Sequence, residues 1–232
     1  MSFFQSIADF FHEGGPTMYI TASVGVVGVV ITIERAIKLY REYPTDSRMF
    51  MSRVKELMLQ DRMEDAIQLC QNEKGLLPDV IKSGLERTGV DESLVRQSME
   101  SAYLDQVPKI TTRIPYLALM ANAGMLFGLL GTVLGLIRQF AAVASADAAQ
   151  KQLLMAKGIA EAMNNTALGL MVALPLLIIH GILSAKATQI IETLERGASQ
   201  FLDWIGLQNY GQLQSRLSSG IKPARPSKAG NV

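Results

Sequence analysis

Three long stretches without charged side chains interrupt this chain of 232 residues. They cover residues 14–33, 114–137 and 162–185, and the only residue in them that titrates near neutral pH is His180. At about 1.5 Å per residue, a helix of this length crosses a hydrocarbon core of roughly 30 Å. A soluble helical core is the alternative, but such a core does not need three runs of this length. The pattern therefore predicts three transmembrane helices.

Lysine and arginine set the expected orientation of these helices. Residues 1–16 contain none, whereas residues 35–113 contain thirteen and the chain from Lys186 onward contains six. The connection between the second and third stretches has only three: Arg138, Lys151 and Lys157. Because the loops on the cytoplasmic side carry the excess of positive residues, we expect the N-terminus outside and the C-terminus inside.

The expected fold class is an all-α integral membrane protein with three transmembrane helices and long cytoplasmic helical extensions. In chain order the predicted segments are an amphipathic helix on the outer face (1–13), transmembrane helix 1 (14–34), a cytoplasmic helical loop (35–113), transmembrane helix 2 (114–140), an outer connection (141–157), transmembrane helix 3 (158–185), a cytoplasmic helical extension (186–206) and a flexible C-terminal tail (207–232). The first segment has a second interpretation, as the frayed beginning of transmembrane helix 1. Pro108 and Pro115 are expected to bend the helix that leads into the second span rather than end it.

The second stretch carries glycines on one helix face, spaced four, three and four residues apart: Gly124, Gly128, Gly131 and Gly135. Small residues in register let another helix approach closely, and such contacts hold helices together in lipid. Membrane helices are generally rich in glycine, but four in register favour tight packing. Thr132 lies beside this stripe.

The third stretch begins with polar residues where a helix facing lipid would carry Leu or Val. Glu161 and Asn165 share one face, and Thr166 lies roughly 140° around the helix from Glu161. A carboxylate in lipid is costly unless it meets water or a partner, so Glu161 either faces a hydrated path or extends into the headgroup region. Thr166 has the alternative of bonding back to its own helix. Asn164 and Asn165 are possible polar residues of a pore.

Composition narrows the classes of function. The net charge of +1 gives no reason to expect nucleic acid as a partner, and 49% hydrophobic against 19% charged residues indicates a membrane protein. Cys70 is the only cysteine, and neither a Cys cluster nor a close His pair suggests a metal site. We expect no cofactor and no enzymatic activity, since no nucleophile–base set or phosphate loop is present. No Asp or Glu lies deep in any of the three stretches, so a channel that moved protons through a carboxylate would need that carboxylate from another chain.

Two motifs together carry a family resemblance. The segment GLLGTVLGLIRQF (128–140), followed by GIAEAMNNTALGLMVALP (158–175), resembles the MotA/TolQ/ExbB proton channel family. In the ExbB and TolQ branches, a G-L-L-G-T-V helix precedes a G-I-x-E-A-L-x-x-T-A-x-G-L helix. The resemblance covers most of residues 14–200. Three spans and an outer N-terminus are typical of the ExbB/TolQ branch, whereas the MotA branch has four spans.

The resemblance implies a stator-like proton-channel subunit in a bacterial inner membrane, with residues 141–157 in the periplasm. Proton motive force would become mechanical work on a partner that reaches the periplasm. The resemblance also implies a pentamer around two single-span helices of the ExbD/TolR type, whose membrane aspartate carries the proton, and a TonB/TolA-like protein beyond them. Thr132 and Thr166 are similar to the pore-lining hydroxyls of the family, and Glu161 is similar to its glutamate in the outer part of the third span.

The sequence departs from the family pattern at Asn164 and Asn165, where the family commonly has small or apolar residues. Two alternatives have the same fold: a membrane scaffold that does not conduct, and a motor of another branch, such as one for gliding motility. The presence of both Thr132 and Thr166 argues against the scaffold. A small-solute carrier would predict inverted repeats or broken helices, and the three stretches contain no internal repeat.

Overall fold

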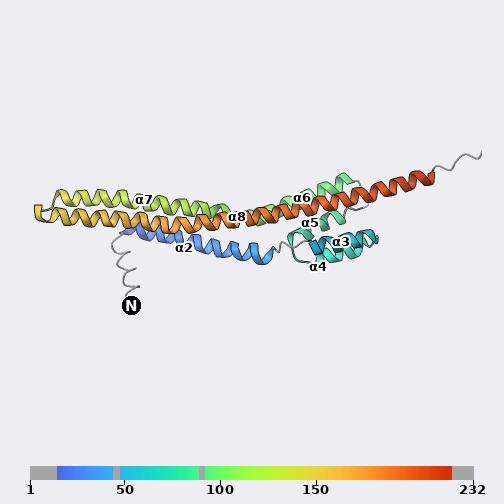
Figure 1. Cartoon of the computed structure of the whole chain (residues 1–232), viewed down its shortest axis with the longest axis horizontal. Coiled ribbons are helices and arrows are strands. Elements are labelled where there is room, and N and C mark those ends of the chain that lie inside the picture. The colour runs from blue at the N-terminus through green and yellow to red at the C-terminus, as the bar shows by residue number, and fades with distance from the viewer. Residues whose placement is uncertain (1–14, 44–47, 89–91, 221–232) are drawn as a thin grey trace, which may run out of the picture. The chain divides into compact units, whose positions relative to one another are not determined.

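The computed structural model describes residues 15–43, 48–88 and 92–220 as a succession of helices (Figure 1). In chain order they are α2 (Pro16–Ile37), the short π-helix η1 (Lys38–Glu42), α3 (Arg48–Leu59), α4 (Met63–Asn72), α5 (Leu76–Leu85), α6 (Glu92–Thr111), α7 (Ile114–Ala144) and α8 (Ala148–Gly220). The predicted amphipathic helix at 1–13 lies outside the described residues. Contacts divide the chain into two compact units, one of residues 1–44 and 108–190 and the other of residues 45–107 and 191–232. Both α6 and α8 contribute to each unit.

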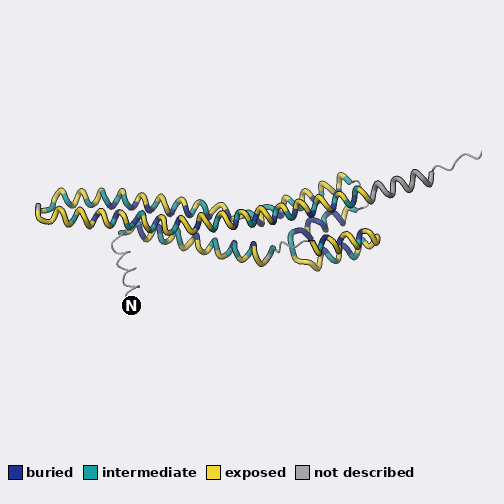
Figure 2. Tube along the Cα trace, in the orientation of Figure 1, coloured by how far each residue is buried: buried dark blue, intermediate teal, exposed yellow. Residues whose placement is uncertain are grey.

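Three helical stretches are long and apolar enough to cross a membrane: Pro16–Arg41, Glu92–Ala144 and Ala149–Leu207. Each overlaps one predicted span, so the all-α class and the three candidate spans are confirmed. Many of their apolar side chains, such as those of Val26 and Ile178, are more than half exposed in the single chain (Figure 2). A large exposed apolar surface of this kind is suited to contact with lipid or with other chains.

Helix α2 begins at Gly15 and Pro16. Gly15 has a φ of 71°, a left-handed value that glycine adopts without a steric penalty. Pro16 fits the first helical position because its fixed φ is close to the helical value and its missing N–H would have no partner there. Only four residues of α2 are buried, namely Met18, Thr21, Gly28 and Arg35. The attachment of α2 to its neighbours therefore depends on a narrow face.

The helix that leads into the second span is interrupted. Helix α6 ends at Thr111 and α7 begins at Ile114, with Arg113 between them at a left-handed φ of 66°. Pro108 lies inside α6, whereas Pro115 lies in the first turn of α7. Because proline has no N–H to donate to the preceding turn, the helical ladder stops before Pro115. As predicted, Pro108 does not end its helix, whereas the same prediction was wrong for Pro115, because the helix is interrupted just before it.

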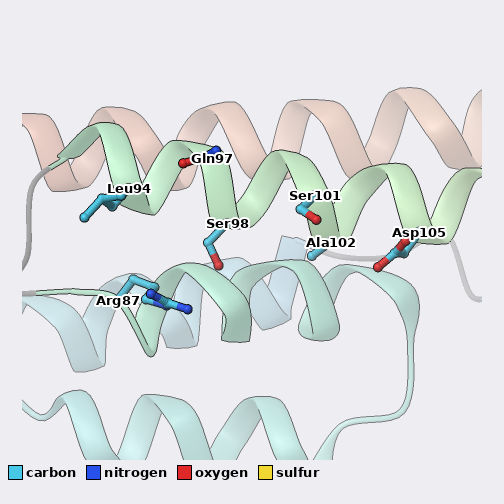
Figure 3. Close-up of a pocket in the computed structure, with 7 residues that line it drawn as sticks. All are labelled: Arg87, Leu94, Gln97, Ser98, Ser101, Ala102 and Asp105. Atoms are coloured by element: carbon cyan, nitrogen blue, oxygen red, sulfur yellow. The ribbon is translucent and has the colours of Figure 1, made fainter.

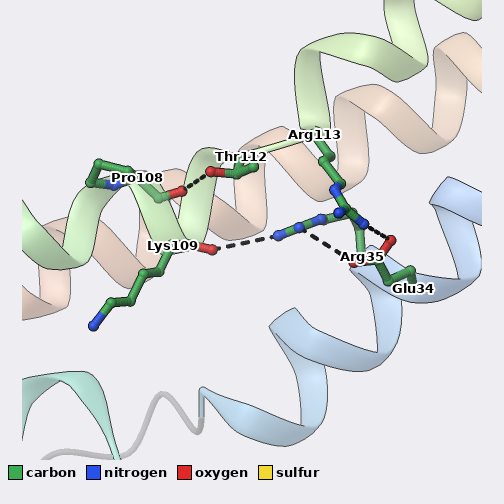
Figure 4. A network of polar contacts seen from close by, with 6 residues as sticks. All are labelled: Glu34, Arg35, Pro108, Lys109, Thr112 and Arg113. Atoms are coloured by element: carbon green, nitrogen blue, oxygen red, sulfur yellow. Dashed lines mark hydrogen bonds and ion pairs between the residues drawn. The ribbon is translucent and has the colours of Figure 1, made fainter.

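Charged side chains join α2 to this interruption (Figure 4). The carboxylate of Glu34 pairs with Arg113 and with its own neighbour, Arg35. The guanidinium of Arg35 also donates a hydrogen bond to the carbonyl of Lys109 at 3.5 Å. Arg35 is only 3% exposed, and a buried guanidinium requires such partners to offset the loss of water. The end of α2 is thus fastened to the junction of α6 and α7.

The third span belongs to a longer helix than the sequence predicted. Helix α8 begins at Ala148, within the segment 141–157 that we expected to be a connection, and only residues 145–147 separate it from α7. It also continues past Gly206 to Gly220, so the predicted flexible tail is helical over its first part. Hydrophobic periodicity marks only the buried part of a helix, whereas backbone hydrogen bonding continues through polar residues. The boundaries taken from the pattern were therefore too narrow.

The second unit packs α3, α4 and α5 with parts of α6 and α8. Glycines mark its closest contacts. A Cβ on Gly84 of α5 would lie 2.7 Å from the sulfur of Met99 and 2.8 Å from the ring of Phe201, which is fully buried. A Cβ on Gly197 of α8 would lie 2.6 Å from Leu77. These three contacts place the core of the unit where α5, α6 and α8 meet.

The segment EKGLLPD (73–79) has the composition of a helix break, yet α5 begins within it. The break is confined to residues 73–75, and Pro78 lies in the first turn of α5, where its missing N–H is not needed. Beyond α5, an open groove of about 440 Å³ runs along α6 (Figure 3). Its lining is mainly polar: Arg87, Leu94, Gln97, Ser98, Ser101, Ala102 and Asp105. Within the described residues, no cluster of three or more His, Cys, Asp or Glu side chains could hold a metal ion.

Cys70 provides a test of the packing in the second unit. Burial raises the pKa of the Cys70 thiol to about 12, and Lys82 and Asp79 have smaller, opposing effects on it. Because the thiolate reacts with maleimides, a rise from 9.0 to about 12 leaves roughly a thousandfold less reactive species at about pH 8. We expect slow labelling of the folded protein and rapid labelling in denaturant, followed by mass spectrometry. Equal rates in both conditions would contradict the described packing.

Candidate ion path along the membrane helices

Helices α7 and α8 meet backbone to backbone. The four glycines of α7 that the sequence singled out, Gly124, Gly128, Gly131 and Gly135, are all buried. A Cβ on Gly128 would lie 2.9 Å from the Cα of Gly169 and 2.9 Å from the carbonyl oxygen of Asn165. A Cβ on Gly169 would lie 3.0 Å from the carbonyl oxygen of Gly124. No side chain fits between the two helices at this point, which we call the glycine seam.

Helix α2 also turns glycines toward α8, where they face side chains. A Cβ on Gly25 would lie 3.1 Å from Val172, and a Cβ on Gly28 would lie 2.6 Å from Leu176. Val172 also faces Gly124 of α7, at 3.1 Å from the position of a Cβ there. One apolar side chain of α8 therefore occupies notches in both neighbouring helices. The three helices form a single packed group, because α2 also contacts α7 directly.

The two threonines singled out from the sequence lie beside the glycine seam rather than in it. Thr132 and Thr166 are both half-buried. The hydroxyl of Thr132 donates a hydrogen bond to the carbonyl of Leu129 in its own helix at 2.6 Å. Among the described residues, no hydrogen bond links Thr132 to Thr166. Each hydroxyl oxygen keeps the capacity to accept a hydrogen bond from water or from another chain.

Glu161 belongs to α8, and its carboxylate lies beside the beginning of α2. Its Oε1 is 3.2 Å from the position that a Cβ on Gly15 would occupy, and the Nη1 of Arg138 is 3.8 Å from the same position. The first turn of a helix has unpaired N–H groups and the positive end of the helix dipole, so a carboxylate is favoured there. Glu161 is half-buried in this place. In the single chain, its side chain is thus directed toward α2.

The two asparagines lie in different surroundings. Asn165 is only 2% exposed, and its Oδ1 accepts a hydrogen bond from the hydroxyl of Thr17 in α2 at 2.9 Å. Its Nδ2 donates to the carbonyl of Glu161 at 3.1 Å. Asn164 is half-buried. Sequence analysis grouped the asparagines as possible pore residues and missed Thr17, because no pattern within one helix reveals a partner 148 positions away.

Three packed helices that are each long and apolar enough to cross a membrane have the architecture of an integral membrane protein. A sequence profile of the MotA/TolQ/ExbB proton channel family matches residues 72–196, and the chain belongs to this family. The resemblance drawn from the two motifs is confirmed. Because the family consists of transporters, the expectation that the chain is not an enzyme is confirmed as well.

Individual relatives agree with the family assignment. A biopolymer transport protein ExbB homolog of Methanothermobacter thermautotrophicus is 24% identical over 84% of this chain and 69% of its own length. The Tol-Pal system protein TolQ of Haemophilus influenzae is 31% identical over 48% of each chain. The biopolymer transport protein exbB1 of Vibrio cholerae is 31% identical over 50% of each chain. The chain thus spans about half the length of the two bacterial relatives and more of the archaeal one.

The glycine seam can be tested with single methyl groups. Gly128→Ala places a Cβ against the backbone of α8, which cannot move aside as a flexible side chain can. We expect a loss of stability of about 1–3 kcal/mol, as is typical of overpacking. Gly181→Ala is the matched control in α8, because apart from the neighbouring backbone of its own helix nothing lies within 4 Å of its Cβ position. Thermal unfolding in detergent measures both variants, and equal midpoints would show that α7 and α8 do not approach this closely.

Proposed function

We propose that this chain is the proton-channel subunit of a motor of the ExbB/TolQ type, which converts proton motive force into mechanical work on a partner that reaches the periplasm. One observation carries the proposal: the family match at residues 72–196 includes both helices with candidate relay hydroxyls, Thr132 in α7 and Thr166 in α8. Relatives named for biopolymer transport and for the Tol-Pal system support the same class.

The proton carrier comes from another chain. No Asp or Glu lies deep within the predicted spans, so the titrating group is the membrane aspartate of a single-span partner of the ExbD/TolR type. Five copies of this chain surround two such partner helices. Family membership supports this arrangement, and the exposed apolar surfaces of α2, α7 and α8 are suited to it.

The hydroxyls of Thr132 and Thr166 relay protons through water toward that aspartate. A hydroxyl donates one hydrogen bond and accepts two, so it serves as a link in a water wire. Thr132 donates to the carbonyl of Leu129 in the single chain, and a relay step requires its hydroxyl to rotate toward water. That rotation exchanges one hydrogen bond for another, at a net cost within about 1 kcal/mol. Thermal motion supplies this readily.

Protonation couples the path to movement. A charged aspartate is held by the polar groups and water along the path, because an ion is costly to transfer into the surrounding apolar environment. Once protonated it is neutral, and the partner helix is free to move. Loss of the proton on the opposite side restores the attachment. The proton gradient therefore gives the movement a direction.

Both threonines should be needed for conduction. Thr166→Val and Thr132→Val keep the shape and remove the hydroxyl, whereas the corresponding Ser variants keep the hydroxyl. The loss of one relay hydrogen bond to an ionic group, about 1.5 kcal/mol, corresponds to a roughly tenfold fall in rate. We expect this fall for the Val variants and near-normal rates for the Ser variants. The measurement is proton flux into liposomes that contain the chain and its single-span partner under a pH gradient.

Two controls accompany this experiment. Oligomer size in detergent must be unchanged in each variant, so that a loss of flux reports on the path. Liposomes with the chain alone should conduct few protons until the partner is added. Equal flux without the partner would contradict a carboxylate supplied by another chain, and normal flux in both Val variants would contradict the hydroxyl relay.

The orientation proposed here places the N-terminus in the periplasm and residues 45–107 in the cytoplasm of a bacterium. Cys70 is buried and unsuited as a reporter, so Cys70→Ala is the background for two exposed sites. Gln71→Cys should react with an impermeant maleimide only in inverted vesicles, and Ser145→Cys, between α7 and α8, only in intact spheroplasts. Both positions are exposed in the structure. The reverse labelling pattern would overturn the orientation.

A further inference from the structure

We propose that Asn165 is a positioning residue that fastens the beginning of α2 to α8 within one chain and does not itself line the ion path. The expected effect of this fastening on proton flux rests on the proposed function. Its expected effect on the packing of α2, α7 and α8 does not. We call the hydrogen-bonded pair of Thr17 and Asn165 the amide latch.

Both polar ends of the Asn165 side chain are engaged inside a single chain. The Oδ1 atom accepts from Thr17 Oγ1 at 2.9 Å, and the Nδ2 atom donates to the carbonyl of Glu161 at 3.1 Å. At 2% exposure, the side chain has almost no surface left to offer to a water-filled pore. An amide placed to line an ion path would instead present its donors and acceptor to water.

The third helix makes room for this bond. Gly131 of α7 lies opposite, where a Cβ would be 2.7 Å from the Oδ1 of Asn165 and 2.9 Å from the hydroxyl of Thr17. Any other residue at this position would occupy the space in which the two polar groups meet. Helices α2, α7 and α8 therefore converge at one hydrogen bond: α2 and α8 supply its donor and acceptor, and Gly131 of α7 leaves the space for it.

The latch matters because it is a hydrogen bond between helices at the beginning of α2, far from the contacts of Glu34 and Arg35 near the end of that helix. In lipid, helices gain nothing from hiding apolar side chains from water, so packing and hydrogen bonds between helices must hold them. Met18, Thr21, Gly28 and Arg35 are the only buried residues of α2. The hydroxyl of Thr21 donates to the carbonyl of Thr17, within α2 itself, and so does not join two helices. The bond of Thr17 to Asn165 does join two, and it lies in the first turn of α2.

The latch also sets the direction of the neighbouring polar groups. With Asn165 held against α2 and α7, Thr166 lies about 100° around α8 and is directed away from the latch. The amide of Asn165 also holds the backbone of Glu161, whose carboxylate lies beside Gly15. Release of the latch would free the beginning of α2 and change the surroundings of both Glu161 and Thr166. Asn165 thus acts on the ion path only through these residues.

The experiment compares shape-matched variants in the full chain reconstituted with its single-span partner. Thr17→Val keeps the shape of the side chain and removes the hydroxyl, and Thr17→Ser keeps the hydroxyl. Asn165→Leu removes both polar atoms of the amide, Oδ1 and Nδ2, at similar volume. Thr21→Val is the matched control, since Thr21 is a buried threonine of the same helix that bonds only within α2. Two quantities are measured: the midpoint of thermal unfolding in detergent and the proton flux under a pH gradient.

We expect Thr17→Val and Asn165→Leu each to lower the unfolding midpoint and to reduce flux severalfold. The double variant should be no worse than Asn165→Leu alone, because both changes remove the same bond. Thr17→Ser, which keeps the hydroxyl, and Thr21→Val should both leave the unfolding midpoint and the flux near the values of the unmodified chain. If Asn165→Leu prevents folding, the comparison of Thr17→Val with Thr17→Ser still tests the latch.

Two outcomes would overturn the proposal. If Asn165→Leu changes flux while Thr17→Val changes neither quantity, Asn165 acts in the path itself. If the unfolding midpoints of both variants are unchanged, the bond does not hold α2. A failure of the proposed function is separate, because the unmodified chain would then show no partner-dependent flux. The unfolding midpoints would decide the latch in that case as well.

Discussion

The membrane helices of this protein depend on the meeting of two backbones at Gly128 and Gly169. In water, apolar side chains would drive α7 and α8 together, but lipid is as apolar as leucine and provides no such drive. Dispersion contacts and hydrogen bonds remain, and both require atoms to approach within a few ångströms. A Cβ on either glycine would lie within 2.9–3.0 Å of the facing backbone. The seam is therefore possible only because both positions lack a side chain.

The seam sorts the polar residues of the spans into two sets. Asn165 lies on the seam side of α8 and meets Thr17 there, so its polarity is used inside the chain. Thr132 and Thr166 lie beside the seam and remain half-buried, so their hydroxyls stay available to water or to another chain. Polar side chains that look alike in the sequence thus differ in how far the helix packing engages them. A group is available to an ion path only if the helix packing leaves it unused.

The two ends of α2 are held by different chemistry. At its beginning the amide latch joins it to α8, and near its end Glu34 joins it to Arg113, where α6 gives way to α7. Buried Arg35 adds a bond to the carbonyl of Lys109. With both ends fastened, α2 forms one group with α7 and α8. In the proposed motor, this group provides a fixed wall along which a partner helix moves when its aspartate gains or loses a proton.

The sequence by itself determined the three candidate spans, the all-α class and the family, because span length and the two membrane motifs are local properties of the chain. The spacing of the glycines also indicated which face of α7 packs closely against another helix. Tertiary structure decided what lies opposite each face. Helical periodicity specifies the direction of a side chain around its own axis but not the identity of its neighbour, so Thr17 and Asn165 could not be paired from the pattern. For the same reason, the interruption at Arg113 and the full extent of α8 became visible only in the folded chain.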